Sequence, residues 1–106
     1  MCASPLLDNL RQLEEFAGYV VSDLGAVRQI CTTHEFVDSE EEACTTALAA
    51  GTDLKLHWPD ELGYGAVRPA AVKDGNISVS QVHLALKRVL RTRFKLGLFD
   101  PPSSVP

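Results

Sequence analysis

Apolar residues recur at helical spacing near both ends of the chain. Near the start, four leucines fall one, three or four residues apart, which predicts an amphipathic helix from about Pro5 to Glu15. These leucines are Leu6, Leu7, Leu10 and Leu13. On such a helix Asp8, Arg11 and Glu14 are expected to face outward.

A second apolar stripe predicts a longer helix near the end of the chain. Its members are Val82, Leu86, Val89, Leu90 and Phe94. Ser78 and Gln81 have the spacing of a capping box, which places the start of this helix, and Gly97 is expected to end it. A turn is predicted at residues 74–76 and a helix start near Pro69.

Two short β-prone runs lie between predicted helices. Residues 19–21 (Tyr-Val-Val) follow a glycine without polar alternation, which is typical of a strand buried on both faces of a parallel sheet. Residues 52–56 form a second, weaker strand candidate. Between them we expect a short helix over residues 26–31 and another that opens at the Ser39 capping box and ends before Gly51. This alternating order predicts an α/β fold that is mostly helical, with about two short parallel strands.

Composition and charge narrow the possible partners. The 106 residues are 45% hydrophobic and 23% charged, as expected for one globular domain at most. A net charge of −4 argues against general attraction to nucleic acid or to an anionic membrane. The first residues show no export signal, and no apolar run is long enough to span a bilayer.

The cysteines and histidines do not form a metal-binding pattern. Cys2, Cys31 and Cys44 are odd in number and lack C-x-x-C spacing, so we expect thiols rather than a disulfide framework. No set of His, Asp and Glu has the spacing of metal ligands. We therefore expect neither a metal nor another cofactor.

Asp23 is the candidate functional residue. It follows the first predicted strand, and the carboxyl ends of parallel strands are where α/β folds bind their ligands. An aspartate after a strand is also a common N-cap for the next helix. Both interpretations stay open on position alone.

Four stretches in this order resemble glycoside hydrolase family 3, especially its β-xylosidase and β-glucosidase members. They are CASPLLDNL at 2–10, GYVVSDLGAV at 18–27, EEEACTTALAAGTDL at 40–54 and RVLRTRFKLGLFDP at 88–101. The resemblance implies part of a (β/α)₈ TIM-like barrel: residues 1–98 would be its last βα units and closing helix, and residues 99–106 the start of a Pro/Ser-rich linker.

The same resemblance implies a function. In that family the phrase matching GYVVSD carries the catalytic nucleophile, so Asp23 is the expected nucleophile of a retaining β-glycosidase. The expected substrates are β-xylosides or β-glucosides, such as oligosaccharides from xylan and cell walls. The acid/base and the residues that hold the sugar would come from the rest of the barrel or from a later domain. This chain alone is therefore expected to be inactive. Family members are often secreted or periplasmic, which leaves this chain's own compartment open.

Other residues near the motifs qualify the resemblance. Leu24 stands where family members often carry tryptophan or cysteine, which leaves the exact substrate open, and residues 54–58 replace a shorter polar turn. His34 is a candidate pocket residue, whereas His57 is interpreted as structural and His83 as outward-facing. The cations Lys87, Arg88, Arg91, Arg93 and Lys95 suggest a phosphate-binding surface when taken alone. We interpret them instead as a solvated helix face near a negative dipole end.

Two alternatives to a glycosidase remain. A signalling receiver domain also places an aspartate at a strand end, where Asp23 would accept a phosphoryl group, but its acidic pair and lysine are not found. A non-catalytic remnant is the other alternative, and the sequence does not separate it from an enzyme fragment.

Overall fold

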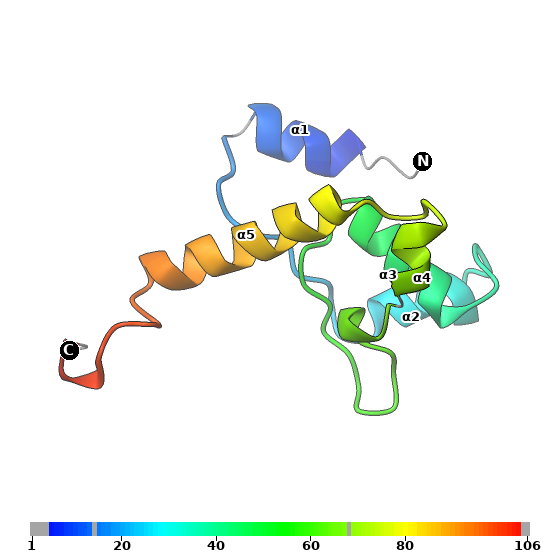
Figure 1. Cartoon of the computed structure of the whole chain (residues 1–106). Coiled ribbons are helices and arrows are strands. Elements are labelled where there is room, and N and C mark those ends of the chain that lie inside the picture. The colour runs from blue at the N-terminus through cyan, green and yellow to red at the C-terminus, as the bar shows by residue number, and fades with distance from the viewer. Residues whose placement is uncertain (1–4, 14, 68, 105–106) are drawn as a thin grey trace.

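The computed structural model describes residues 5–13, 15–67 and 69–104, and this part of the chain is mostly helical. Its α-helices are α1 (Pro5–Leu13), α2 (Ala26–Thr32), α3 (Glu40–Ala49), α4 (Pro69–Lys73) and α5 (Val79–Lys95). Two short 3₁₀ helices are η1 (Tyr64–Ala66) and η2 (Pro102–Ser104). Figure 1 shows α2, α3 and α4 gathered together, with α5 running out from this group towards the C-terminus.

Serine side chains begin the two longest helices, as predicted. At α5 the capping box is complete: the Gln81 N–H donates to Ser78 Oγ over 3.2 Å, and the Ser78 N–H donates to Gln81 Oε1 over 2.8 Å. At α3 the Glu42 N–H donates to Ser39 Oγ, but the Glu42 carboxylate accepts from the Asp38 N–H instead. The predicted capping box at α3 is therefore only half formed, because the returning side chain reaches one residue further back.

Glycines end these two helices in the left-handed backbone region. Gly51, after α3, has φ 104°, and Gly97, after α5, has φ 70°. Because a Cβ is unfavourable at such angles, the chain reverses here at low cost only with glycine. The predicted helix ends are confirmed at both positions.

The two predicted strands meet as a single parallel bridge between Val21 and Leu54. Backbone hydrogen bonds flank the bridge: the Leu54 N–H donates to the Val20 carbonyl over 3.1 Å, and the Ser22 N–H donates to the Leu54 carbonyl over 2.9 Å. Val21 is exposed, so the expected burial on both faces is wrong for this structure. Among the described residues, each of the two segments pairs only with the other. A two-stranded pair of this kind is not stable on its own, so the hydrogen bonding does not extend into a longer β-ladder.

Two small apolar clusters form the core on either side of α3. The first joins α2 to α3 through Val27, Ala43, Cys44 and Ala47. The second joins α3 to α4 and α5 through Leu48, Ala71, Ile77 and Ala85. Most of these side chains are small, so the hydrophobic contribution of each is modest.

A buried carboxylate, Asp53, ties four segments of the chain together. Its Oδ2 accepts from Arg11 Nη2 in α1 over 2.5 Å and from the Val20 N–H over 2.9 Å, and its Oδ1 accepts from Arg88 Nη1 in α5 over 3.0 Å. The side chain is 1% exposed. A buried charge is tolerated because it is paired and fully hydrogen-bonded.

These contacts correct two expectations for cations. Arg11, predicted to face outward on α1, points inward to Asp53 and also donates to the Gly51 carbonyl over 3.1 Å. Arg88, which we expected on a solvated face with the other cations of α5, also points inward and pairs with Asp53. The other members of that basic group in α5 are exposed: Lys87, Arg91, Arg93 and Lys95.

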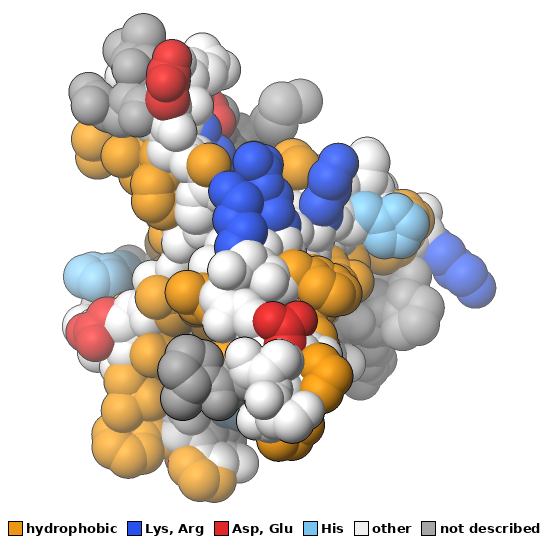
Figure 2. All heavy atoms as spheres, turned by 90° about the vertical axis from the view of Figure 1, so that its left-hand side faces the viewer, with side chains coloured by type: hydrophobic (Ala, Val, Ile, Leu, Met, Phe, Trp, Pro, Cys, Tyr) orange, Lys and Arg blue, Asp and Glu red, His pale blue; other side chains and the backbone are white. Residues whose placement is uncertain are grey.

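The apolar stripes are less buried than their periodicity predicted. Leu6 in α1 is 82% exposed, whereas Leu7 and Leu10 are partly buried on the side of α1 that also carries Arg11. In α5, Val89 is buried, but Val82, Leu86 and Phe94 are exposed. Figure 2 shows hydrophobic side chains spread widely over one face of the molecule. Phe94 packs against Phe99 beyond the helix, with ring centroids 4.4 Å apart, but Val82 and Leu86 keep exposed surface, so α5 displays a partly unpartnered apolar face.

Replacing Asp53 with alanine should remove a substantial part of the free energy of unfolding of this chain. The change leaves two guanidinium groups and one N–H without their buried acceptor, a loss of about 3 kcal/mol out of a total of roughly 5–15 kcal/mol for a domain. Urea unfolding followed by helical circular dichroism should show a midpoint far below that of the Asp74→Ala control in an exposed turn. Equal midpoints for the two variants would show that the Asp53 network does not hold the helices together.

Candidate functional site

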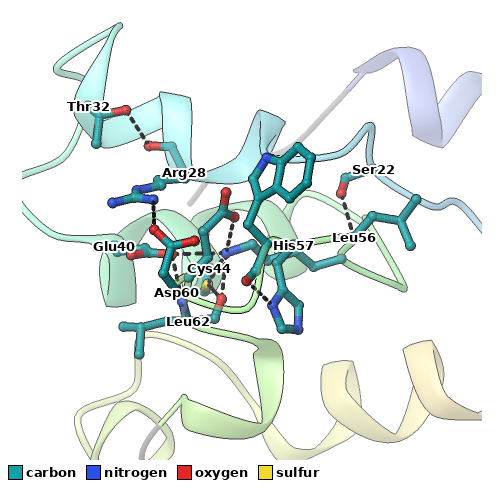
Figure 3. A network of polar contacts seen from close by, with 12 residues as sticks. Ser22, Arg28, Thr32, Glu40, Cys44, Leu56, His57, Asp60 and Leu62 are labelled. Atoms are coloured by element: carbon teal, nitrogen blue, oxygen red, sulfur yellow. Dashed lines mark hydrogen bonds and ion pairs between the residues drawn. The ribbon is translucent and has the colours of Figure 1, made fainter.

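The parallel bridge brings two loops to the same edge of the structure. Because Val21 and Leu54 run in the same direction, the segments that follow them emerge side by side. The Leu56 N–H donates to Ser22 Oγ over 3.1 Å, as Figure 3 shows, and the Gly25 N–H donates to the Leu56 carbonyl over 3.3 Å. Asp23 therefore lies in a turn that is fixed against residues 55–58.

Asp23 presents an exposed carboxylate at this edge. Its Oδ1 accepts a hydrogen bond of 2.8 Å from the N–H of Leu24, the next residue. The N-cap of α2 is Gly25, and no side chain caps that helix. The carboxylate therefore does not serve as the helix N-cap, which was the structural alternative for this residue.

The surroundings of Gly25 identify the side chains that pack against the turn carrying Asp23. Its φ of 78° is in the left-handed region, and a Cβ added there would lie 3.3 Å from Glu61 Oε1 and 3.5 Å from Trp58 Nε1. Glycine is thus required by backbone conformation, and a larger residue would crowd both neighbours. Glu61 and Trp58 form the immediate surroundings of the turn that carries Asp23.

A buried lysine, Lys55, holds in place the second loop, which is the segment of residues 55–62 that follows Leu54. Its Nζ lies 3.2 Å from Glu40 Oε1 and 3.5 Å from Glu61 Oε2, and it also donates to the Leu62 carbonyl. The Lys55 side chain is 1% exposed. Figure 3 shows this network between α3 and the loop. The two carboxylates offset the desolvation cost of burying the ammonium group. Because Lys55 also contacts Glu61 and Leu62, it connects the beginning of this loop to its end.

The thiol of Cys44 belongs to the same buried cluster. Its Sγ lies 3.6 Å from Lys55 Nζ, and burial raises the pKa of the thiol, with the nearby ammonium acting in the opposite direction. Cys31 and Cys44 are both free thiols, and Cys2 lies outside the described residues. Across the described ranges, no group of His, Cys, Asp and Glu is arranged to hold a metal ion.

A surface ion pair ties the outside of the loop to α2. Arg28 Nη1 lies 3.1 Å from Asp60 Oδ2 (Figure 3). The hydrogen bond between them lowers the pKa of Asp60 and raises the pKa of Arg28. Both groups are exposed, so this pair adds orientation rather than much stability.

The histidines and Leu24 lie at different distances from Asp23. Leu24 is adjacent and exposed. His34 is exposed just beyond α2, whose seven residues span roughly 10 Å, so the helix separates it from Asp23 at the other end. The Nδ1 of His57 is 2.9 Å from the Trp58 carbonyl, and His83 is exposed on α5 as expected.

Sequence analysis did not identify the buried ionic residues around the site. Lys55 lies in the weaker strand candidate of residues 52–56, whose pattern does not predict a buried charge. A lysine between Leu54 and Leu56 in a β-prone run, with acidic residues on both sides in the sequence, was the available signal. Asp53 belongs to the stretch at 40–54 that resembles the family, and this resemblance does not predict its ion pairs.

Comparison with known proteins identifies the family. Residues 2–92 match the glycosyl hydrolase family 3 N terminal domain. This chain belongs to that family. The resemblance seen in the sequence is thus confirmed.

Curated relatives of the chain are named as glycosidases. It is 38% identical over 93 residues to a putative β-xylosidase of Formosa agariphila and 33% identical over 99 residues to a periplasmic β-glucosidase of Salmonella typhimurium. It covers 12% of each of these proteins, and the matches take in 88% and 93% of the chain.

A solved β-glucosidase from Erythrobacter marinus has a similar structure. The TM-score is 0.77 with 41% sequence identity, covering 90% of this chain and 12% of that one. The likeness supports the fold of a family 3 β-glucosidase segment. None of the helices in the described ranges combines the length and the apolar character that a membrane-spanning segment requires.

The buried cluster predicts unequal reactivity of the two described thiols. In a Cys2→Ser background, Cys44 should react with a thiol reagent about tenfold or more slowly than Cys31 at pH 8, because burial limits access and the raised pKa lowers the thiolate fraction. Mass spectrometry of the labelled peptides gives the two rates, and unfolding in urea should bring them together. Equal labelling rates for Cys31 and Cys44 in the folded chain would contradict the burial of the Cys44 thiol.

Proposed function

We propose that this chain is the nucleophile-bearing part of a retaining β-glycosidase that hydrolyses β-xylosides or β-glucosides, with Asp23 as the nucleophile. The observation that supports the proposal is the exposed carboxylate at the shared end of a parallel pair, in a chain of glycosyl hydrolase family 3. The relatives named as β-xylosidases and β-glucosidases give the two substrate classes.

The chemistry requires two carboxyl groups with different roles. The ionised Asp23 attacks the anomeric carbon and forms a covalent glycosyl-enzyme, while a protonated carboxyl group about 5–5.5 Å away donates its proton to the leaving oxygen. Water then attacks the anomeric carbon, assisted by the second group acting as a base. The C–O bond to Asp23 breaks and the carboxylate is regenerated.

The second carboxyl group is best assigned outside this chain. Asp53 and Glu61 have almost fully buried side chains and are held in ion pairs, so neither reaches a substrate. Glu40 is also committed to Lys55 and to the Leu62 N–H. The acid/base is proposed to come from another part of the complete enzyme, together with the residues that hold the sugar hydroxyls.

A partial barrel accounts for the surface of this chain. A complete (β/α)₈ barrel needs about 250 residues, and this chain spans 12% of the relatives described above. Residues 1–98 are proposed to be the last βα units of the barrel, and residues 99–106 the beginning of a linker. The bridge segments and the open face of α5 would then pack against the remainder of the barrel.

Two further residues are proposed to border the substrate. Leu24 is exposed beside Asp23 and would border the bound sugar where other members carry tryptophan or cysteine. His34 is proposed to contact a part of the substrate away from Asp23, because α2 lies between the two residues.

We expect the 106-residue chain to show no measurable hydrolysis of aryl β-xylosides or β-glucosides. Activity should appear when the chain replaces the matching segment of the Erythrobacter marinus β-glucosidase, because that chimera supplies the missing groups. In the chimera, Asp23→Asn should lower kcat roughly a thousandfold or more, since the amide keeps the size but cannot attack.

Asp38→Asn is the matched control, because Asp38 is an exposed aspartate of a different loop. It should leave kcat within about twofold. Near-normal turnover by Asp23→Asn would remove Asp23 from the reaction. An inactive chimera that folds like its parent enzyme would instead favour a non-catalytic remnant.

A further inference from the structure

Trp58 is a large aromatic side chain that is held in place without being buried. It is 53% exposed, although its indole is close enough to Gly25 to contact a Cβ added there. Core packing does not explain this residue, because about half of the side chain has no protein neighbour. Its position beside the Asp23 turn distinguishes it from exposed aromatic residues elsewhere, such as Phe36 in the loop after α2.

The loop around Trp58 is anchored on both sides. The Trp58 carbonyl accepts from the Glu61 N–H over 3.0 Å and lies 2.9 Å from His57 Nδ1. Lys55 clamps the start of the loop, and Asp60 is paired with Arg28 on α2. The backbone that carries Trp58 is therefore fixed, and because the indole lies against Gly25, ordering the ring on a ligand costs little entropy.

Of the two neighbouring rings, Trp58 is the one directed to the Asp23 turn. The Nε2 of His57 lies 2.9 Å from the position of a Cβ on Gly63, whereas the Trp58 indole lies against Gly25, two residues after Asp23. Leu24 and Leu56 are exposed in the same two loops and carry no aromatic ring. The aromatic surface beside the candidate nucleophile is thus supplied from the second loop.

We propose that Trp58 is a specificity-determining residue whose exposed indole face packs against a sugar ring of the substrate attacked by Asp23. The inference rests on the proposed function. A pyranose ring has an apolar face of C–H groups, which complements the negative face of an aromatic ring. Such a contact forms in the ground state and persists in the transition state, so it acts on binding rather than on chemistry.

The test uses the chimera that carries the whole chain, with Trp58→Ala, Trp58→Leu and Trp58→Phe variants. Alanine and leucine should each raise KM about tenfold with kcat within twofold, because uniform binding is lost. Phenylalanine should restore most of the affinity because it keeps an aromatic face. If any apolar side chain were sufficient, leucine would bind the substrate as well as phenylalanine. Phe36→Ala is the matched control and should leave KM unchanged.

Binding without turnover separates this inference from the proposed function. In the Asp23→Asn chimera, calorimetry should show an unreactive β-thioglycoside binding about tenfold more weakly when Trp58→Leu is added. If leucine keeps KM and binding within twofold while Asp23→Asn abolishes turnover, the Trp58 assignment is overturned and the nucleophile stands. If Asp23→Asn stays active, the proposed function fails, and the calorimetry still decides the role of Trp58.

Discussion

The buried carboxylate of Asp53 is the interaction on which the arrangement of this chain depends. It joins α1 through Arg11, α5 through Arg88 and the first bridge segment through the Val20 N–H. Ion pairs of this kind are directional, so they specify one relative placement of the segments even where they add little net free energy. By fixing Val20 against residue 53, the network sets the register of the parallel bridge. The position of Asp23 beside residues 55–58 follows from that register.

A second buried charge, Lys55, fixes the position of the loop that follows Leu54. Asp53 and Lys55 are two residues apart and use their charges on different elements: Asp53 binds α1 and α5, and Lys55 binds α3 and the end of its own loop. Asp53 and Lys55 are thus buried beside the two apolar clusters, while Asp23 and Trp58 are exposed. The two buried charges therefore position the turn that carries Asp23 and the loop that carries Trp58 relative to the helices.

Local sequence signals predicted the elements well where the determinants are themselves local. Ser78 with Gln81, and the glycines at 51 and 97, fixed helix ends that depend on a few neighbouring atoms. The parallel direction of the two β-prone runs and the place of Asp23 after the first also emerged correctly. Arg11 and Arg88 were misplaced because their partner lies 42 and 35 residues away, beyond any periodicity. The stripe on α5 was identified, but periodicity cannot say whether another element covers it.

Trapping the covalent intermediate tests the central claim most directly. A 2-deoxy-2-fluoro glycoside with a good leaving group slows breakdown of the glycosyl-enzyme, so the sugar remains attached to the attacking carboxylate. In the chimera carrying this chain, peptide mass spectrometry should find the added sugar on Asp23. A label on Asp38 or Asp53 instead, or on a carboxylate outside this chain, would contradict the assignment of Asp23 as the nucleophile.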